Sequence, residues 1–384
     1  MFVRIRNLSI WTMAACIFFS ASAIAQNQQS FRDVSPAHAQ QKSRQNDDMV
    51  SGVREKLESI YAVARQAKGA EHYTECLVGC KQVYESKLAS PEESDFLRRL
   101  SAWLYVQRGE VYSQAAVRAE ANGDPRAETY ERQALKDYSA AVEWGPSWRA
   151  YHNRGVSNAI LGHYKEALAD FNKAISTNTD QQHPSSYFNR AEVLYELGQL
   201  EDAVRDYTRA LSADPADVQA LTGRAHAKFE LNQSAEALRD FDEAIQLDPQ
   251  NAVTFADRGD LHASVGNWRQ AATDFQQAIK LDRKLGRAYQ SAAWLMATCP
   301  DEKLQNRDLA LKAANRAIKL DGQSDYRYLD TAAAALANAG KYQDAIKYLQ
   351  QALQNSPPPE VIPDLRNRLS IYQAGRPYRD SIQR

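Results

Sequence analysis

The sequence predicts an all-α solenoid, in which antiparallel helix pairs stack on one another and one more helix caps the C-terminal end. Two observations predict this fold. Blocks that start at residues 184, 218, 252 and 286 follow one another every 34 residues, and two positions of the block are alanine in every copy. The chain of 384 residues also contains only 16 Gly and 13 Pro, which is too few for a turn-rich all-β protein.

The composition excludes several functional classes. Lys and Arg together number 47 and Asp and Glu 48, so the chain has no basic excess for a nucleic-acid backbone. The hydrophobic fraction of 44% is close to that of soluble globular proteins, so the chain can bury a core. Four cysteines are too few for a dense disulfide framework.

Residues 1–25 have the pattern of a secretory signal peptide. Arg4 and Arg6 precede an apolar stretch, and the tripeptide Ala-Ile-Ala at 23–25 matches a cleavage signal of small residues. We therefore expect a mature chain that begins at Gln26 and is exported, to the periplasm or out of the cell. The alternative is an uncleaved anchor, because an apolar stretch of about 18 residues reaches the lower limit for spanning a bilayer.

Seven blocks can be aligned, starting at residues 102, 148, 184, 218, 252, 286 and 326, with one insertion in the first and one in the sixth. Small residues at their twentieth and twenty-seventh positions let two helices touch closely, while larger apolar residues fill the remaining space. These positions are alanine throughout: Ala134, Ala167, Ala203, Ala237, Ala271, Ala310 and Ala345, then Ala141, Ala174, Ala210, Ala244, Ala278, Ala317 and Ala352.

This pattern resembles the tetratricopeptide repeat (TPR), a helix–turn–helix unit of 34 residues. Pro215 and Pro249 each follow an aspartate that can cap the next helix. Glycines occupy the turn between paired helices in four blocks: Gly162, Gly198, Gly266 and Gly340. The resemblance covers residues 102–358 and implies a right-handed superhelix of helix pairs.

Around this array the sequence predicts segments of different character. In the first block Ala134 follows Gly109 by 25 positions, whereas in a later block Ala237 follows Ala225 by 12. The extra residues predict that both helices are longer by nearly two turns. The predicted order is a signal peptide (1–25), a disordered polar spacer (26–48), a degenerate N-terminal helical repeat (49–101), a repeat with elongated helices (102–147), an array of six repeats (148–358) whose fifth member (286–325) has a loop insertion, and a capping helix with a tail (359–384).

A second resemblance lies in the C-terminal part of the chain. The segments AWLMATCPD at 293–301, YLDT at 328–331 and GRPYR at 375–379 are similar to the endings of exported bacterial multi-TPR proteins of unassigned role. In that group a second cysteine often follows the position of Cys299 by nineteen residues. Here that position is Ile318, so this pairing is excluded.

Arginine at the seventh position and aspartate at the twenty-third occur together in five blocks and are both missing from the last two. Because these positions face each other in an antiparallel hairpin, we predict structural ion pairs within each hairpin or to the next helix. The alternative is a ladder of arginines that binds an anion. The expected pairs are Arg108 with Asp137, Arg154 with Asp170, Arg190 with Asp206, Arg224 with Asp240, and Arg258 with Asp274.

In TPR proteins the first helices usually line a concave face that binds partners. Aromatic anchors ringed by acids there suit a protein or peptide with apolar and basic residues. The TPR subclass that clamps a C-terminal carboxylate uses Lys, Arg and Asn on this face, where the middle repeats here have Glu. The alternatives are a merely solvated face or one filled by the spacer. The concave-face candidates are Phe188, Glu192, Tyr195, Glu196, Thr222, His226, Phe229, Glu230, Asp260, Arg287, Gln290 and Trp294.

The remaining polar residues offer little chemistry. His72, Cys76 and Cys80 share a helical face and could bind a metal, but they lack a fourth ligand, and we expect the two thiols to be core residues. His226 with Glu192 is the single acid–base pair that can be assembled. We therefore expect a non-catalytic interaction scaffold without cofactor, metal or nucleic acid. Three alternatives stay open: a membrane-anchored envelope assembly factor, self-association through the elongated hairpin at 102–146, and a thiol- or metal-dependent activity.

Overall fold

The computed structural model describes residues 47–177 and 184–380, and every regular element in them is a helix. This confirms the predicted all-α solenoid. The predicted signal peptide and nearly all of the predicted spacer lie outside the described residues. The chain divides after Asp214 into two compact units, which are described here one at a time.

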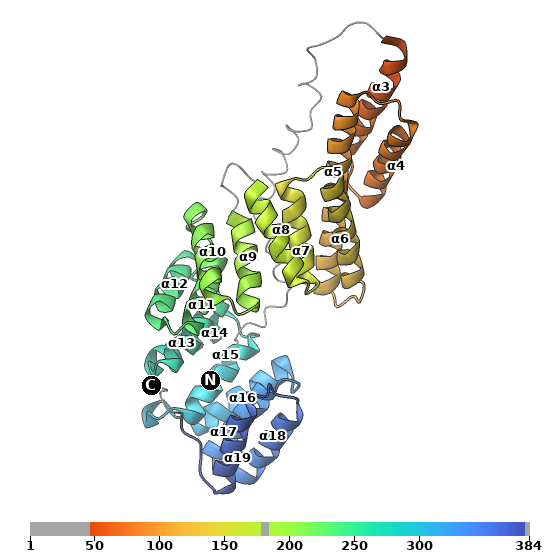
Figure 1. The fold of residues 1–384 in the computed structure, drawn as a ribbon. Coiled ribbons are helices and arrows are strands. Elements are labelled where there is room, and N and C mark those ends of the chain that lie inside the picture. Colours follow the sequence, from red (N-terminus) through yellow and green to blue (C-terminus); the bar gives the residue numbers. More distant parts are fainter. Residues whose placement is uncertain (1–46, 178–183, 381–384) are drawn as a thin grey trace. The chain divides into compact units, whose positions relative to one another are not determined.

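The first unit consists of helices that follow one another as antiparallel neighbours (Figure 1). The helices are α3 (Asp47–Ala64), α4 (Ala70–Ser86), α5 (Pro91–Ala121), α6 (Ala127–Trp144), α7 (Trp148–Ile160), α8 (Tyr164–Thr177), α9 (Pro184–Glu196) and α10 (Leu200–Ala213). At its N-terminal end, Leu57, Leu100 and Leu104 form a core that includes both Cys76 and Cys80.

The elongated hairpin differs from its prediction. Helix α5 has 31 residues and α6 has 18, against 13 in α11 (Val218–Glu230) and 14 in α12 (Ser234–Leu247) of a regular repeat. The predicted boundary after residue 101 is wrong, because α5 runs through it. The helix begins early because Ser90 and Glu93 form a reciprocal capping box, with Pro91 in the first turn.

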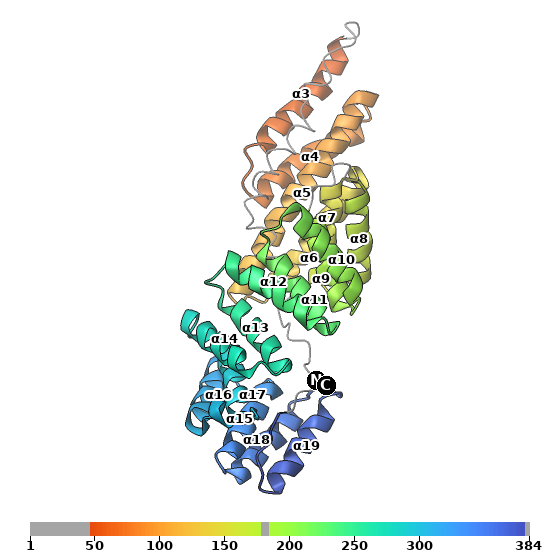
Figure 2. The ribbon, with the colours of Figure 1, turned by 90° about the vertical axis from the view of Figure 1, so that its left-hand side faces the viewer.

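The second unit continues the pairs and closes them. Its remaining helices are α13 (Ala252–Ser264), α14 (Trp268–Leu281), α15 (Gly286–Thr298), the short 3-10 helix η2 (Glu302–Leu304), α16 (Arg307–Asp321), α17 (Tyr326–Asn338), α18 (Tyr342–Gln354) and α19 (Ile362–Gln373). The loop insertion predicted in the 286–325 repeat is the segment with η2. Helix α19 lies beside α17 and α18 (Figure 2) and buries Leu365 and Tyr372 in their core.

Close helix contacts explain the small residues of the repeat. The fourteen alanines of the two columns are each at most 1% exposed. At the eighth position a Cβ on Gly109 would lie 2.6 Å from the ring of Tyr138, and one on Gly259 would lie 2.6 Å from the ring of Phe275. The backbone of the first helix therefore approaches an aromatic ring of the second helix too closely for any side chain.

Candidate protein-binding surface

All five Arg–Asp pairs are present within their hairpins. The shortest distances between guanidinium nitrogen and carboxylate oxygen run from 2.6 to 2.8 Å. Each contact is bidentate, with Nε and Nη2 on the two carboxylate oxygens, which is the strongest geometry for this pair. The hydrogen bond to the aspartate raises the pKa of Arg108, Arg154 and Arg258, so these arginines stay charged.

Several of these arginines also bind the preceding repeat. Nη1 of Arg108 donates to Thr74 at 2.9 Å, and Nη1 of Arg258 donates to Asp242 at 2.7 Å. The Arg258 guanidinium also lies 5.6 Å from the centre of the Phe255 ring. One guanidinium thus joins two helices of its own repeat to the repeat before it, as expected of a structural residue.

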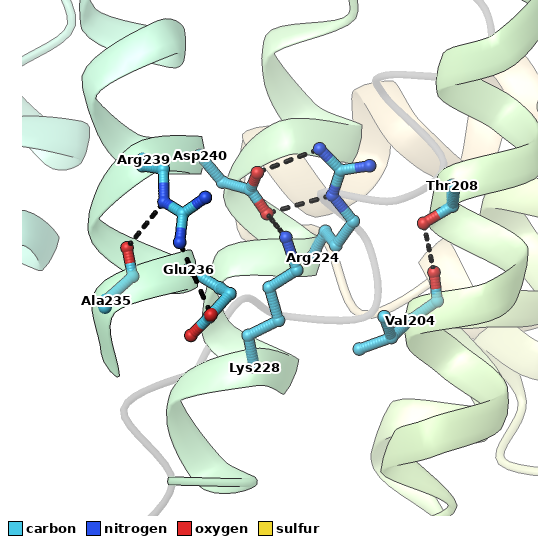
Figure 3. A network of polar contacts seen from close by, with 8 residues as sticks. All are labelled: Val204, Thr208, Arg224, Lys228, Ala235, Glu236, Arg239 and Asp240. Carbon is cyan, nitrogen blue, oxygen red and sulfur yellow. Dashed lines mark hydrogen bonds and ion pairs between the residues drawn. The ribbon is translucent and has the colours of Figure 1, made fainter. Parts of the chain in front are cut away.

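Figure 3 shows the pair of the 218 repeat in detail. Asp240 accepts hydrogen bonds from Nε and Nη2 of Arg224 at 2.9 and 2.8 Å and from Nζ of Lys228 at 2.7 Å. Two cations therefore hold one carboxylate that is only 4% exposed. The pair between Arg239 and Glu236, in contrast, joins exposed side chains on the same helix and contributes little to stability.

Five of the concave-face candidates are buried, so the expectation that they stand open to a partner is wrong. In the first unit these are Phe188, Glu192 and Tyr195, and in the second they are His226 and Asp260. The rings of Phe188 and Tyr207 meet edge to face at 6.0 Å, and the Tyr207 hydroxyl donates to Glu192. These side chains fill the space between helices because large groups on a first helix also meet the neighbouring helix of the stack.

In the second unit, buried charges join three first helices. Asp257 on α13 lies 3.2 Å from Nε2 of His226 on α11 and 2.6 Å from Nη1 of Arg287 on α15. Burial opposes ionisation of Asp257, but Arg287 and His226 outweigh it and lower the pKa of this carboxyl. Asp260 lies farther from Arg287, at 3.9 Å, and burial raises its pKa to about 6.

Glu192 and His226, the single acid–base pair that the sequence suggested, belong to different units. Glu192 accepts a hydrogen bond from Tyr207 in its own unit, and His226 contacts Asp257 in the other. Each side chain therefore has a structural partner of its own. Their roles in the two units are to satisfy buried polar groups, which would otherwise cost free energy.

The remaining candidates fall into two groups. Gln290 donates to Thr331 at 2.7 Å, and the Trp294 indole donates to Asp380 at 3.1 Å, so both are engaged within the chain. Glu196, Phe229 and Glu230 are partly exposed, as is Thr222. Trp294 is likewise partly exposed.

Sequence reasoning missed a cluster at the C-terminal end. Arg368 on α19 forms a bidentate ion pair with Asp330 on α17, at 2.8 and 3.0 Å, and both side chains are buried. The segments at 293–301, 328–331 and 375–379 supply most of this cluster. The sequence did contain a signal for this cluster. All three segments match the same group of proteins, and segments that recur together can be in contact in the fold even when they lie far apart in the chain.

The described residues contain three buried cysteines. Cys76, Cys80 and Cys299 are buried free thiols, and burial raises the pKa of Cys80 to about 11. Among the described residues no group of three or more His, Cys, Asp or Glu side chains is placed to hold a metal ion. Within the same residues, no helix is long and apolar enough to cross a membrane.

Comparison with known proteins identifies the repeat. A model of the tetratricopeptide repeat family matches residues 188–252 and 302–358, and a second model of this repeat matches residues 149–181. The helix pairs within these matched residues are tetratricopeptide repeats. Proteins with this repeat generally mediate protein–protein interactions.

Similar curated proteins match over short segments only. Human serine/threonine-protein phosphatase 5 is 33% identical over 105 residues, which are 27% of this chain and 20% of the phosphatase. The STIP1 homolog of Dictyostelium discoideum is 33% identical over 87 residues, 22% of this chain and 15% of that protein. The chain thus spans a fifth or less of these relatives, and the phosphatase matches through its TPR region alone.

Solved structures show the same fold. A TPR protein from Parabacteroides merdae ATCC 43184 superposes with a TM-score of 0.51 at 20% identity, covering 70% of this chain and 99% of that one. A chain of the APC/C hetero-tetramer Cut9–Hcn1 superposes with a TM-score of 0.53 at 16% identity, covering 83% of this chain and 55% of that one. At these identities the likeness concerns the fold alone.

Proposed function

We propose that this chain is a non-catalytic scaffold that binds a protein or peptide partner outside the cytoplasm. The observation that carries this proposal is the use of its buried charged side chains. The Arg–Asp pairs, the Tyr207–Glu192 bond and the His226–Asp257 contact each join neighbouring helices. These charged and polar groups therefore stabilise the TPR array. This fold typically serves as a binding scaffold.

The partner surface is proposed at the C-terminal end of α11, in the second unit. Phe229 and Glu230 end this helix, and both are partly exposed. A partly exposed aromatic ring beside a carboxylate suits a partner with an apolar anchor and a basic residue. Carboxylates at the rim would raise the rate of association with such a partner more than its final affinity.

The location outside the cytoplasm follows from the leader at residues 1–25 as read from the sequence. Mass spectrometry of the protein from its own cells tests it. A chain that starts at Gln26 in an envelope or secreted fraction supports export with cleavage. A chain that keeps Met1 in the membrane fraction supports the alternative, an anchored envelope factor. A chain that keeps Met1 in the soluble cytoplasm would contradict both.

The interaction is tested by quantitative co-purification of the full-length chain from its own cells. A Phe229→Ala, Glu230→Gln variant is compared with Leu309→Ala, which truncates an aliphatic side chain that is 50% exposed on α16. We expect a partner that is retained by Leu309→Ala and reduced at least about tenfold by the double variant, the equivalent of about 1.4 kcal/mol. Equal retention by both would remove this surface and direct attention to the elongated α5–α6 hairpin.

A further inference from the structure

The tail after α19 returns to the end of α15, and through residue 380 it forms neither a helix nor a strand. The backbone N–H of Asp380 donates to the carbonyl of Thr298 at 2.8 Å, and Nη1 of Arg379 donates to the carbonyl of Ala297 at 2.9 Å. These carbonyls belong to the last turn of α15, where the helix supplies no N–H donors for its own carbonyls and favours a cation. The tail therefore completes the C-terminal end of this helix.

Three consecutive tail side chains contact the helices of the last repeats and the cap. The Tyr378 ring lies 6.0 Å from the Trp294 ring, and the Arg368 guanidinium lies within 5.5 Å of both ring centres. The second terminal nitrogen of Arg379 donates to Asn338 at 2.9 Å and to Gln305 at 3.0 Å. Asp380 accepts from the Trp294 indole at 3.1 Å.

The receptor is held together by contacts that do not involve the tail. The buried pair of Arg368 with Asp330 fixes the cation beside Trp294. Gln305 donates to the carbonyl of Cys299 at 2.9 Å, which orients the amide oxygen that Arg379 uses. The tail residues 378–380, in contrast, are only partly buried. A peptide-binding site has the same arrangement, because its receptor is already formed and the bound segment stays partly exposed. The tail also supplies the usual anchors, an aromatic residue and an arginine.

We propose that the surface formed by Trp294, Gln305, Asn338 and Arg368 is a second binding site, for an extended partner segment that presents an aromatic residue, an arginine and an aspartate in this order. The chain's own tail occupies this site. A segment joined to its receptor by a short connection has an effective concentration in the millimolar range. A partner therefore has to displace the tail. This site is separate from the surface at Phe229 and Glu230 and does not depend on it.

The test uses the full-length chain with a weakened tail, Tyr378→Ala with Arg379→Ala, and a fluorescently labelled peptide with the sequence of residues 375–384. We expect this variant to bind the peptide at least about tenfold more tightly than the unmodified chain does. A further Asn338→Ala substitution in the receptor is expected to remove most of that gain. A control peptide with alanine in place of its tyrosine and its second arginine is expected not to bind.

Two results would overturn the proposal. One is a variant whose circular dichroism is that of the unmodified chain but which binds neither peptide. The other is a variant that binds both peptides equally. If the tail variant does not fold, hydrogen exchange of the unmodified chain tests whether a peptide can displace the tail. We expect amides at 376–380 to exchange faster than those of α19, and faster still with millimolar peptide added. Exchange of the tail and α19 as one unit, unaffected by the peptide, would reject the site.

Discussion

Two groups of repeats differ in the position of their ion pairs. The first group is formed by the repeats between residues 102 and 285, and the second by the last two repeats, 286–358. In the first group each hairpin has its own Arg–Asp pair. In the last two repeats Ala292 and Ala332 replace the arginine. Arg287 there pairs with Asp257 on another first helix, a type of contact that the array also has in Arg149 with Glu110, and Arg368 of the cap pairs with Asp330.

The difference reflects what each repeat has to contact. A repeat inside the array has a similar repeat on either side, so the same Arg–Asp pair can stabilise the hairpin in every copy. The final repeats have to bind α19 and the tail, which do not resemble a repeat. Open ends of repeat arrays need such a closing element because their apolar face would otherwise meet water. The last ion pair among the described residues therefore joins α17 to the capping helix α19, where Asp330 pairs with Arg368.

The packing of rings follows the same division. In the array, the first helix meets an aromatic ring on the second, as Gly259 meets Phe275. In the final repeats, the corresponding second-helix residues are Ala314 and Leu349, and the first helix has Ala293 and Ala333. Alanine at this position is not confined to the final repeats, because Ala225 packs in one cluster with the Phe241 ring in the array.

The largest effect is expected at the cap. Arg368→Met leaves the Asp330 carboxylate buried, with 8% of its side chain exposed and without its cation. We expect the free energy of unfolding to fall by about 3–5 kcal/mol, measured by urea denaturation. Removing both charges, with Arg368→Met and Asp330→Leu, is expected to recover most of this loss. A double variant as unstable as the single one would show that the guanidinium, not the stranded charge, carries the effect.

A smaller effect is expected for one pair of the array. Arg258→Met leaves Asp274, but the arginine side chain is 20% exposed, so water reaches the carboxylate once the arginine is gone. We expect a loss of about 2 kcal/mol, between the values for exposed and buried pairs. A double-mutant cycle with Asp274→Asn measures the coupling. A cost equal to that of Arg368→Met would remove the distinction between the two regions.

The ring contact of the array can be tested at Gly259. The Cβ of alanine there would lie 2.6 Å from the Phe275 ring, so the ring or the helix has to shift. We expect Gly259→Ala to cost about 1 kcal/mol net, because overpacking outweighs the gain in helix propensity. Adding Phe275→Leu, which copies the final repeat, is expected to make the alanine favourable. A stabilising single substitution would show that the ring moves freely.

The smallest effect is expected for a buried acid of the array that has no cation. Glu131 on α6 accepts hydrogen bonds from Ser113 and Ser157. Burial raises the pKa of Glu131, and the two hydroxyls partly oppose this. An acid with a raised folded-state pKa destabilises the fold as pH rises from its unfolded value of about 4.3.

We therefore expect Glu131→Gln to gain stability relative to the unmodified chain as pH increases from about 4, until the raised pKa is passed. Chemical denaturation at several pH values measures this difference. The effect is small because the hydroxyls already stabilise the carboxylate. A difference that shrinks with rising pH would mean that Glu131 is stabilised when charged, which reverses the sign. Asp274→Asn serves as a control, since that acid has a cation.

The sequence was sufficient for the repeat, the turns and the position of the five Arg–Asp pairs. These follow from local rules. A small residue is needed where helices touch, and paired positions face each other across a hairpin. At the turns, Gly162 and Gly340 both have a φ of 78°, which favours glycine. Asn232 occupies the same place in the 218 repeat with a φ of 61°, as asparagine tolerates this conformation.

The candidate surface could not be predicted to the same extent. The alignment of the repeats places Phe188, Glu192 and Phe229 on one side of the first helices, but it does not show how deeply each side chain is buried. Burial depends on the neighbouring helix, on its side chains and on the local crossing of the two. Glu192 is 3% exposed because Tyr207 reaches it, whereas Phe229 stays partly exposed.

The sequence by itself determined the helix pairs, their period and their internal ion pairs, because each depends on residues within one hairpin at fixed spacing. Only the tertiary structure decided which concave-face candidates remain exposed and where the tail binds. Trp294 and Asp380 are 86 residues apart and share a hydrogen bond. Such a contact depends on the path of the chain through α16 to α19, and no periodicity relates its two ends.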